Sequence, residues 1–216
     1  MDTKLIIFDF DGTLGDTRQT IVTTMQTTIE ELQLPERSDE ECAARIGLPL
    51  AGCFESLYPT LSADEIKRCA ETYRRIFFEL VKHIKPQAFP GVVETLAKLK
   101  ERGFTLTIAS SRSHNSLVQL VSDLHIAGYI SYVLGADDVE RAKPNPEPVL
   151  NTLAATDFAA AHTLVVGDMS VDILMGSNAC AKTCGVTYGN GTREQLEQAG
   201  ADYIIDSINQ LLDIVL

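Results

Sequence analysis

The sequence lacks an excess of basic charge: 30 Asp and Glu residues outnumber 18 Lys and Arg residues, and the net charge is −12. Nucleic-acid backbones select basic surfaces, so this balance argues against a protein that binds DNA or RNA. It does not argue against small anionic substrates, because those respond to the charge of a local site. We therefore expect no nucleic-acid partner.

The sequence also has no internal repeat and no apolar run long enough to cross a bilayer. Its first residues, Met1-Asp2-Thr3-Lys4, do not resemble the basic start of a secretion signal. The five cysteines are odd in number and form no Cys-x-x-Cys pair, and we interpret them as buried thiols of a reducing compartment. These absences predict a cytoplasmic protein with no membrane partner.

Short apolar runs alternate with helical patterns over most of the 216 residues, which predicts an α/β fold with a Rossmann-like parallel sheet. Four apolar runs are the expected strands of this sheet, namely residues 5–8, 104–109, 129–134 and 164–166. Two further runs, at residues 183–186 and 203–205, are expected as edge strands.

Residues 16–87 interrupt this alternation with helical patterns and no convincing strand. Two Ser-x-x-Glu pairs, which begin at Ser38 and Ser62, have the spacing of helix-starting capping boxes. We therefore predict an all-helical cap domain at residues 16–87. It would be inserted into an α/β catalytic core formed by residues 1–15 and 88–216.

Two other segments carry signals of helix ends. Gly103 stands where a C-terminal glycine would follow a helix at residues 91–102. Asn145-Pro146 has the pattern of an N-cap residue followed by a first-turn proline. Both signals predict helices that pack on the sheet.

Polar side chains follow the predicted strands at their carboxyl ends. Asp9 and Asp11 follow the first strand, Ser110 and Ser111 the second, and Asp168 the fourth. Open parallel sheets bind ligands outside the carboxyl ends of their strands, so these residues are expected around one crevice.

Lys143 lies in a proline-rich loop before the fourth strand and is expected to reach the same crevice. Three carboxylates, two hydroxyls and one ammonium suit a hard cation together with a phosphate, and Mg²⁺ prefers such oxygen ligands. No His or Cys stands at these strand ends, so a zinc site is disfavoured.

The spacing of Asp9 and Asp11 suits attack on a phosphate ester. Residues two apart at a strand end project to roughly the same side, and Gly12 then lets the chain turn sharply. One carboxylate can attack phosphorus in line while the other protonates the departing oxygen and later activates water. Lys143 and nearby backbone amides would hold the other phosphate oxygens.

Four segments, in chain order, resemble the motifs of the haloacid dehalogenase superfamily. They are Asp9-Phe10-Asp11-Gly12-Thr13-Leu14, the strand end at Ser110, Lys143-Pro144 and Gly167-Asp168-Met169-Ser170-Val171-Asp172. The resemblance covers essentially the whole chain. The helical insert, with a loop at residues 46–50, is similar to the cap of the phosphoglycolate phosphatase-like branch.

This resemblance implies roles for individual residues. Asp9 would be the nucleophile that forms an aspartyl-phosphate, and Asp11 the general acid and base. Ser110 would bind the phosphoryl group through a hydrogen bond, and Lys143 would neutralise the nucleophile and the phosphate.

The resemblance also implies a Mg²⁺ cofactor. Asp9, the backbone carbonyl of Asp11 and Asp168 would hold the ion, with Asp172 in support. Asp172 has a second interpretation, because an acid in the first turn of a helix is favourable through the helix dipole alone.

The remaining candidates are weaker in pattern. Ser111 is a candidate for substrate binding or a residue at a helix entry, and Arg45 is a candidate for substrate contact because it precedes the loop at residues 46–50. Arg112 follows the second motif, so contact with substrate is one interpretation, but we favour a surface position. Cys180 stands where relatives often have glycine, and the sequence offers no physical reason for this.

Asp11 separates the functions of this superfamily. A dehalogenase needs no acid at this position, and phosphonate-cleaving relatives lack it, so we predict a phosphatase acting on small phosphorylated metabolites. A β-phosphoglucomutase-like phosphomutase and a pyrophosphatase are alternatives, although the loop at residues 47–52 lacks the basic residues typical of a mutase. The non-enzyme alternative is a regulatory protein that binds a phosphorylated metabolite. We expect a monomer or a homodimer.

Overall fold

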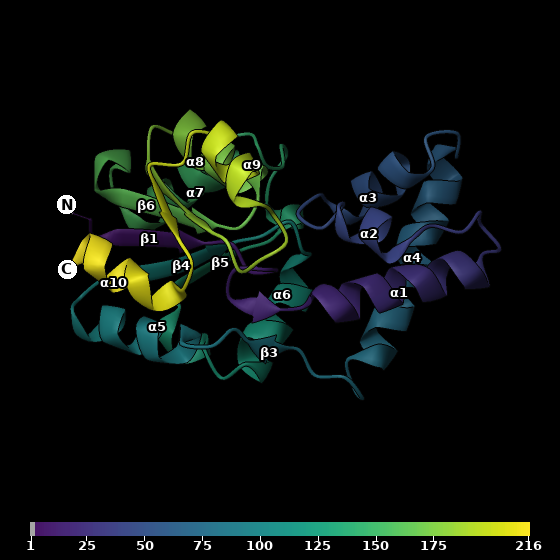
Figure 1. The fold of residues 1–216 in the computed structure, drawn as a ribbon, viewed down its shortest axis with the longest axis horizontal. Helices are drawn as coiled ribbons and strands as arrows, with labels where there is room; N and C mark the ends of the chain where they lie inside the picture. The colour runs from purple at the N-terminus through teal and green to yellow at the C-terminus, as the bar shows by residue number, and fades with distance from the viewer. Residues whose placement is uncertain (1–2) are drawn as a thin grey trace.

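The computed structural model describes residues 3–216, and within that range six parallel strands form one central sheet (Figure 1). In chain order they are β1 (Leu5–Phe8), β4 (Thr105–Ala109), β5 (Tyr132–Leu134), β6 (Thr163–Gly167), β7 (Lys182–Val186) and β8 (Tyr203–Ile205). Their spatial order is β5-β4-β1-β6-β7-β8. The α/β fold with a parallel sheet is therefore confirmed.

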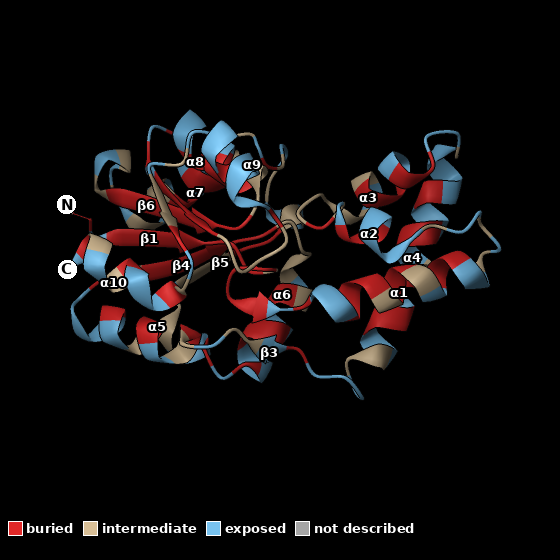
Figure 2. Cartoon of the chain, viewed as in Figure 1, coloured by how far each residue is buried: buried red, intermediate tan, exposed pale blue. Residues whose placement is uncertain are grey.

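Strand β1 lies between β4 and β6 in the middle of the sheet, and every one of its side chains is buried. Ile6 and Phe8 belong to the larger apolar cluster, which includes residues of α5 (Val92–Glu101) and α10 (Leu211–Val215). Leu5 and Ile7 belong to a second cluster on the opposite face, which includes residues of α7 (Glu147–Thr156) and α8 (Ser170–Asn178). Helices cover both faces of the sheet, as parallel sheets require (Figures 1 and 2).

The other helices complete the layers and form a separate group beside the sheet. Two of them, α6 (His114–Asp123) and α9 (Arg193–Gln198), belong to the sheet-bearing part. Short 3₁₀ turns lie at Ala127–Tyr129, Ala136–Asp138, Ala160–His162 and Ile208–Gln210. The separate group consists of α1 (Arg18–Glu31), α2 (Asp39–Ala43), α3 (Leu50–Leu57) and α4 (Ala63–Leu80).

We refer to residues 18–80 as the helical segment. Its helices pack their buried faces on one another (Figure 2). The rings of Tyr73 and Phe77 are stacked 5.9 Å apart, and the ring of Phe54 lies edge-on to Tyr73. The capping boxes predicted at Ser38 and Ser62 are present, so the starts of α2 and α4 were correctly predicted.

The chain enters and leaves the helical segment through a two-stranded antiparallel ribbon of β2 (Gly15–Asp16) and β3 (Gln87–Ala88). The sequence predicted no strand over residues 16–87, which is wrong at its two ends. Strands of two residues are too short to show an alternating apolar pattern, so periodicity could not reveal them.

Three details of the core differ from the sequence prediction. Strand β7 is not an edge strand, because it pairs with both β6 and β8 and the edges are β5 and β8. Tyr129 ends a 3₁₀ turn rather than beginning a strand. Pro146, not Asn145, is the N-cap of α7, although the Asn145 side chain does accept a hydrogen bond from the Glu147 amide at 3.0 Å.

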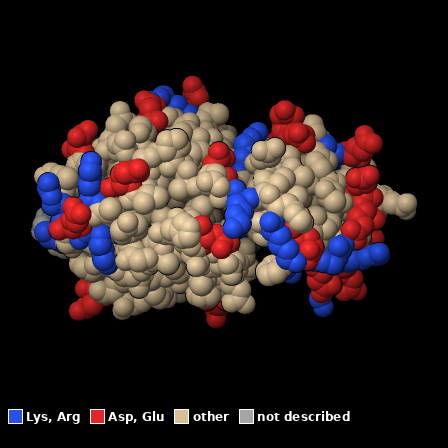
Figure 3. All heavy atoms as spheres, turned by 90° about the horizontal axis from the view of Figure 1, so that it is seen from below, with Lys and Arg blue, Asp and Glu red and all other residues tan. Residues whose placement is uncertain are grey.

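The surface agrees with the low content of basic residues. On the face shown in Figure 3, acidic and basic side chains are interspersed rather than gathered into one basic patch. None of the helices between residues 3 and 216 combines the length and the apolar composition that crossing a bilayer requires.

Candidate active site

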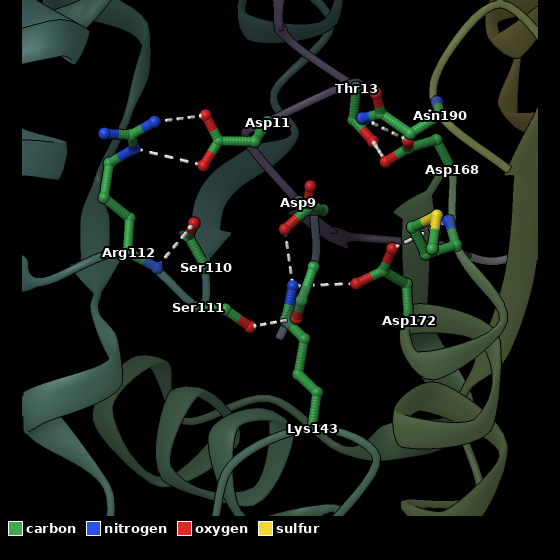
Figure 4. A network of polar contacts seen from close by, with 12 residues as sticks. Asp9, Asp11, Thr13, Ser110, Ser111, Arg112, Lys143, Asp168, Asp172 and Asn190 are labelled. Atoms are coloured by element: carbon green, nitrogen blue, oxygen red, sulfur yellow. Dashed lines mark hydrogen bonds and ion pairs between the residues drawn. The ribbon is translucent and has the colours of Figure 1, made fainter. Parts of the chain in front are cut away.

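The carboxyl ends of three adjacent strands bring the predicted residues together. Asp9 directly follows β1, which pairs with β4 on one side and β6 on the other. Ser110 therefore lies at the end of the neighbouring strand and Asp168 at the end of the other, as Figure 4 shows. All three residues are buried.

Three buried carboxylates form one cluster. Oxygen atoms of Asp9, Asp168 and Asp172 all lie within 4.8 Å of one another. Asp172 comes from the first turn of α8, and its Oδ2 accepts a hydrogen bond from the Met169 amide at 3.0 Å. Asp172 therefore caps its own helix and also joins the cluster, so its two interpretations are compatible.

Lys143 inserts its ammonium group between two of these carboxylates. Its Nζ lies 2.5 Å from Asp9 Oδ1 and 2.7 Å from Asp172 Oδ1, and only 3% of its side chain is exposed. Burial alone would lower the pKa of Lys143, but the adjacent Asp172 and Asp9 outweigh that effect and raise it. Lys143 therefore stays protonated beside Asp9.

Asp168 is fixed by residues that the sequence analysis did not single out. It accepts hydrogen bonds from Thr13 Oγ1 at 3.0 Å, and from the amide and the side chain of Asn190 at 2.7 and 3.2 Å. Gly12 has a φ of +92°, and a Cβ there would lie 2.2 Å from Asp168 Oδ2. Only glycine thus fits the turn that follows β1.

The cluster has the properties of a site for a hard divalent cation. Burial raises the pKa of Asp9 well above its ordinary value, and the charges of Asp172 and Asp168 raise it further while Lys143 lowers it. Burial and the charge of Asp172 raise the pKa of Asp168 to about 7. Lys143 alone does not balance three carboxylates, and a bound cation would stabilise their ionised forms. Their all-oxygen donor set fits Mg²⁺.

The side chain of Asp11 turns away from this cluster. Its Oδ1 accepts hydrogen bonds from Arg112 Nη2 at 2.7 Å and from Thr17 Oγ1 at 2.6 Å, and its Oδ2 accepts one from Arg112 Nε at 3.0 Å. The Asp11 carboxylate is therefore held apart from the cluster by a two-pronged ion pair with Arg112 (Figure 4).

The interpretation of Arg112 as a surface residue is wrong. Its side chain is only 9% exposed, and its guanidinium lies 4.7 Å from the centre of the Phe77 ring on α4. The sequence signal was its position, two residues beyond Ser110, but a side chain at a strand end can point either into a crevice or out to solvent.

The two serines have different surroundings. Ser110 Oγ accepts a hydrogen bond from the Arg112 amide at 3.3 Å. Ser111 Oγ donates to the carbonyl of Gly47, in the loop at residues 46–50, at 2.6 Å. Arg45 Nε donates to Ser56 Oγ at 2.9 Å, and Arg45 is not among the described residues that line the crevice.

A cavity of about 800 Å³ lies between the carboxyl edge of the sheet and the helical segment. The core contributes mainly polar residues to it, including Asp9, Asp11, Ser110, Ser111 and Arg112. The helical segment contributes mainly apolar side chains, including Ile21, Met25, Leu48, Tyr73, Phe77 and Phe78. The cavity thus has a charged floor and an apolar roof.

Comparison with known proteins supplies an independent view of this geometry. Residues 6–186 match the family model described as haloacid dehalogenase-like hydrolase. This range includes every one of the polar residues on the cavity floor.

Three curated relatives align along nearly their whole length. The "Probable phosphatase IndB" of Dickeya dadantii is 37% identical over 96% of this chain and 91% of its own. The "Pyrophosphatase PpaX" of Halalkalibacterium halodurans is 32% identical over 100% of this chain and 98% of its own. The "Phosphoglycolate phosphatase" of Vibrio parahaemolyticus is 30% identical over 99% and 96%.

Proposed function

Because the chain belongs to the haloacid dehalogenase-like hydrolase family, we propose that it removes phosphate from small-molecule monoesters with Asp9 as nucleophile and Mg²⁺ as cofactor. The chain is a phosphatase of this family. The observation that carries the proposal is the burial of Asp9 at the end of β1, within 4.8 Å of Asp168 and Asp172 and in contact with Lys143.

In the first half of the reaction, an oxygen of Asp9 attacks phosphorus and the bond from phosphorus to the departing oxygen breaks. Asp11 supplies the proton that the departing oxygen takes up. Lys143 holds Asp9 Oδ1, which directs the other oxygen towards substrate, and Ser110 offers a hydroxyl to the phosphoryl group.

In the second half, water attacks the aspartyl-phosphate on Asp9. Asp11 takes a proton from this water and the bond from phosphorus to Asp9 breaks. Phosphate leaves, Asp9 is a carboxylate again, and Asp11 again carries the proton for the next departing oxygen. The presence of Asp11 favours turnover over simple binding, because a regulatory protein that only holds a phosphorylated metabolite needs no acid and base.

Asp9, Asp168 and the backbone carbonyl of Asp11 would hold Mg²⁺, with Asp172 in support. The ion would offset the negative charges of the nucleophile and the phosphate. Support comes from the raised pKa values of Asp9 and Asp168, because such a cluster lacks enough positive charge of its own.

We further propose that residues 16–87 serve as a cap that encloses small substrates over the core of residues 1–15 and 88–216. The relatives named pyrophosphatase make inorganic pyrophosphate a second candidate substrate. A mutase is disfavoured, since the loop at residues 47–52 has no basic side chain. A cytoplasmic location, and a monomeric or homodimeric state, stay predictions.

The test is hydrolysis of p-nitrophenyl phosphate. We expect activity that requires Mg²⁺, is lost in EDTA, and falls at least about 1000-fold in Asp9→Asn with the fold intact. Asp64→Asn, an exposed carboxylate at the start of α4, is the matched control and should retain activity. Activity that survives full chelation would contradict the metal assignment, and a near-normal rate in Asp9→Asn would contradict the nucleophile.

A further inference from the structure

Both oxygens of the Asp11 carboxylate are already in use. Arg112 donates to each of them, and Thr17 donates to Oδ1. The oxygen that passes a proton to the departing oxygen of a substrate has to turn towards that substrate and away from Arg112. Proton transfer by Asp11 therefore weakens its contact with Arg112 during each turnover.

Opening this contact leaves the Arg112 guanidinium without its negatively charged partner, which costs free energy in a buried site. The guanidinium of Arg112 has little access to water, since 9% of the side chain is exposed and one face packs on Phe77. Ser116 accepts a hydrogen bond from Nη1 at 3.2 Å but brings no negative charge. A buried charge that loses its partner is strongly destabilised, so another anion has to replace Asp11.

The substrate is the natural source of that anion. In Figure 4 the Asp11 carboxylate lies between Asp9 and Arg112. The leaving group of a phosphoryl group on Asp9 would therefore extend past Asp11 towards Arg112. Arg112 Nη2 is 2.7 Å from Asp11 Oδ1, so an anion separated from the departing oxygen by about one or two atoms would reach the guanidinium.

We propose that Arg112 selects substrates whose leaving group carries a second anionic group, and that this group takes the place of Asp11 on the guanidinium and frees Asp11 for the departing oxygen. The proposal rests on the phosphatase function proposed above. Arginine suits this exchange, because its planar fork pairs with a carboxylate or a phosphate through two parallel hydrogen bonds. The contact with Phe77 would make the bound anion a link between the core and α4.

A pair of substrates of equal shape tests the proposal. In 2-phosphoglycolate the leaving group ends in a carboxylate, and in isobutyl phosphate it ends in two methyl groups of similar size. We expect Arg112→Gln to lower kcat/KM for 2-phosphoglycolate by about 10- to 100-fold more than for isobutyl phosphate. Arg112→Lys, which keeps the charge and loses the fork, should lie between. Arg75→Gln on α4, an exposed arginine paired with Glu31, is the matched control.

A binding measurement separates recognition from catalysis. In 3-phosphonopropionate and 3-methylbutylphosphonate a methylene group replaces the bridging oxygen of the two substrates, so neither is a phosphate ester, and their dissociation constants can be measured by calorimetry with Mg²⁺. The wild-type protein should prefer 3-phosphonopropionate, and Arg112→Gln should lose that preference.

An equal loss for both members of each pair would show that Arg112 only supports the structure, and would overturn the proposal. An unchanged preference in Arg112→Gln would overturn it as well. If the wild-type protein hydrolysed no phosphate ester, the proposed function would fail, and the phosphonate measurements would still decide the role of Arg112. Circular dichroism checks that each variant is folded.

Discussion

At the scale of single residues, the buried acidic cluster lowers the stability of the folded protein when its carboxylates are ionised and no cation is bound. Asp168 is fully buried, and its pKa is raised to about 7, first by burial and then by Asp172. A carboxyl group whose pKa is higher in the folded state than in the unfolded chain binds more protons when folded. Its ionisation therefore lowers the stability of the folded state as pH rises.

This sign gives a prediction for the metal-free protein. Its free energy of unfolding should fall as pH rises from about 4 to about 7, with Asp168 contributing about 2 to 4 kcal/mol of that fall. Asp168→Asn should remove this part of the slope and be more stable than wild type at pH 8 in EDTA, because an amide can still pair with Thr13 and Asn190. Urea denaturation across this pH range provides the measurement.

The same variant should gain no stability from Mg²⁺, whereas wild type should gain it. Asp64→Asn, at an exposed site, serves as control and should retain both the slope and the response to Mg²⁺. An Asp168→Asn protein with the wild-type slope would show that Asp168 is not the group responsible for the pH dependence of stability.

How much of the site was predictable follows from the same residues. Asp9, Ser110 and Asp168 stand directly after apolar runs, and parallel strands end at the same edge of a sheet. That these three residues lie at one edge was therefore predictable from the sequence. The direction of a side chain was not predictable in this way. Arg112 follows the same rule of position as Ser110, yet its burial depends on Asp11 and on Phe77, which is remote in sequence. Asn190 follows β7, whose interior place in the sheet was not predicted.

At the scale of elements, the ends of helices show how the sequence sets local conformation. Helix α5 is followed by Gly103, with φ +83°, and α8 by Cys180, with φ +59°. At both ends, the residue after the left-handed position donates an amide hydrogen bond to the carbonyl of the third-last helical residue. These bonds run from Phe104 to Leu99 at 3.1 Å and from Ala181 to Gly176 at 3.0 Å. Both helices thus end in the same motif, which favours glycine at the left-handed position.

This backbone conformation favours glycine at position 180, and it predicts the effect of substitutions. Cys180→Gly should raise the free energy of unfolding by about 1 kcal/mol, because it relieves a left-handed backbone. Cys180→Ala keeps that backbone and removes only the thiol, so its stability should stay near that of wild type. Thermal or urea denaturation measures both.

The reverse substitution provides the control. Gly103→Ala should lower the free energy of unfolding by about 1 kcal/mol, since no atom lies within 4 Å of the added Cβ and only the backbone conformation opposes it. Equal stabilisation by Cys180→Gly and Cys180→Ala would mean that the thiol, not the backbone, is the cause.

At the scale of the whole molecule, two parts of different character meet at one cavity. The sheet-bearing part supplies charge, and the helical segment supplies apolar surface. Polar contacts across the crevice include the hydrogen bond from Ser111 to the Gly47 carbonyl and the packing of Arg112 on the Phe77 ring. The alternation of patterns was enough to predict the parallel sheet, but the pairing across the crevice depends on side chains that sequence periodicity does not place.

The central claim is that Asp9 carries the phosphoryl group while Asp9 and Asp168 share one divalent ion. A crystal structure of the protein with Mg²⁺ and beryllium trifluoride, a mimic of a phosphoryl group on aspartate, tests both at once. We predict the beryllium on a carboxylate oxygen of Asp9 and the ion between Asp9 and Asp168. A beryllium on another residue, or an ion bound without Asp168, would contradict the account.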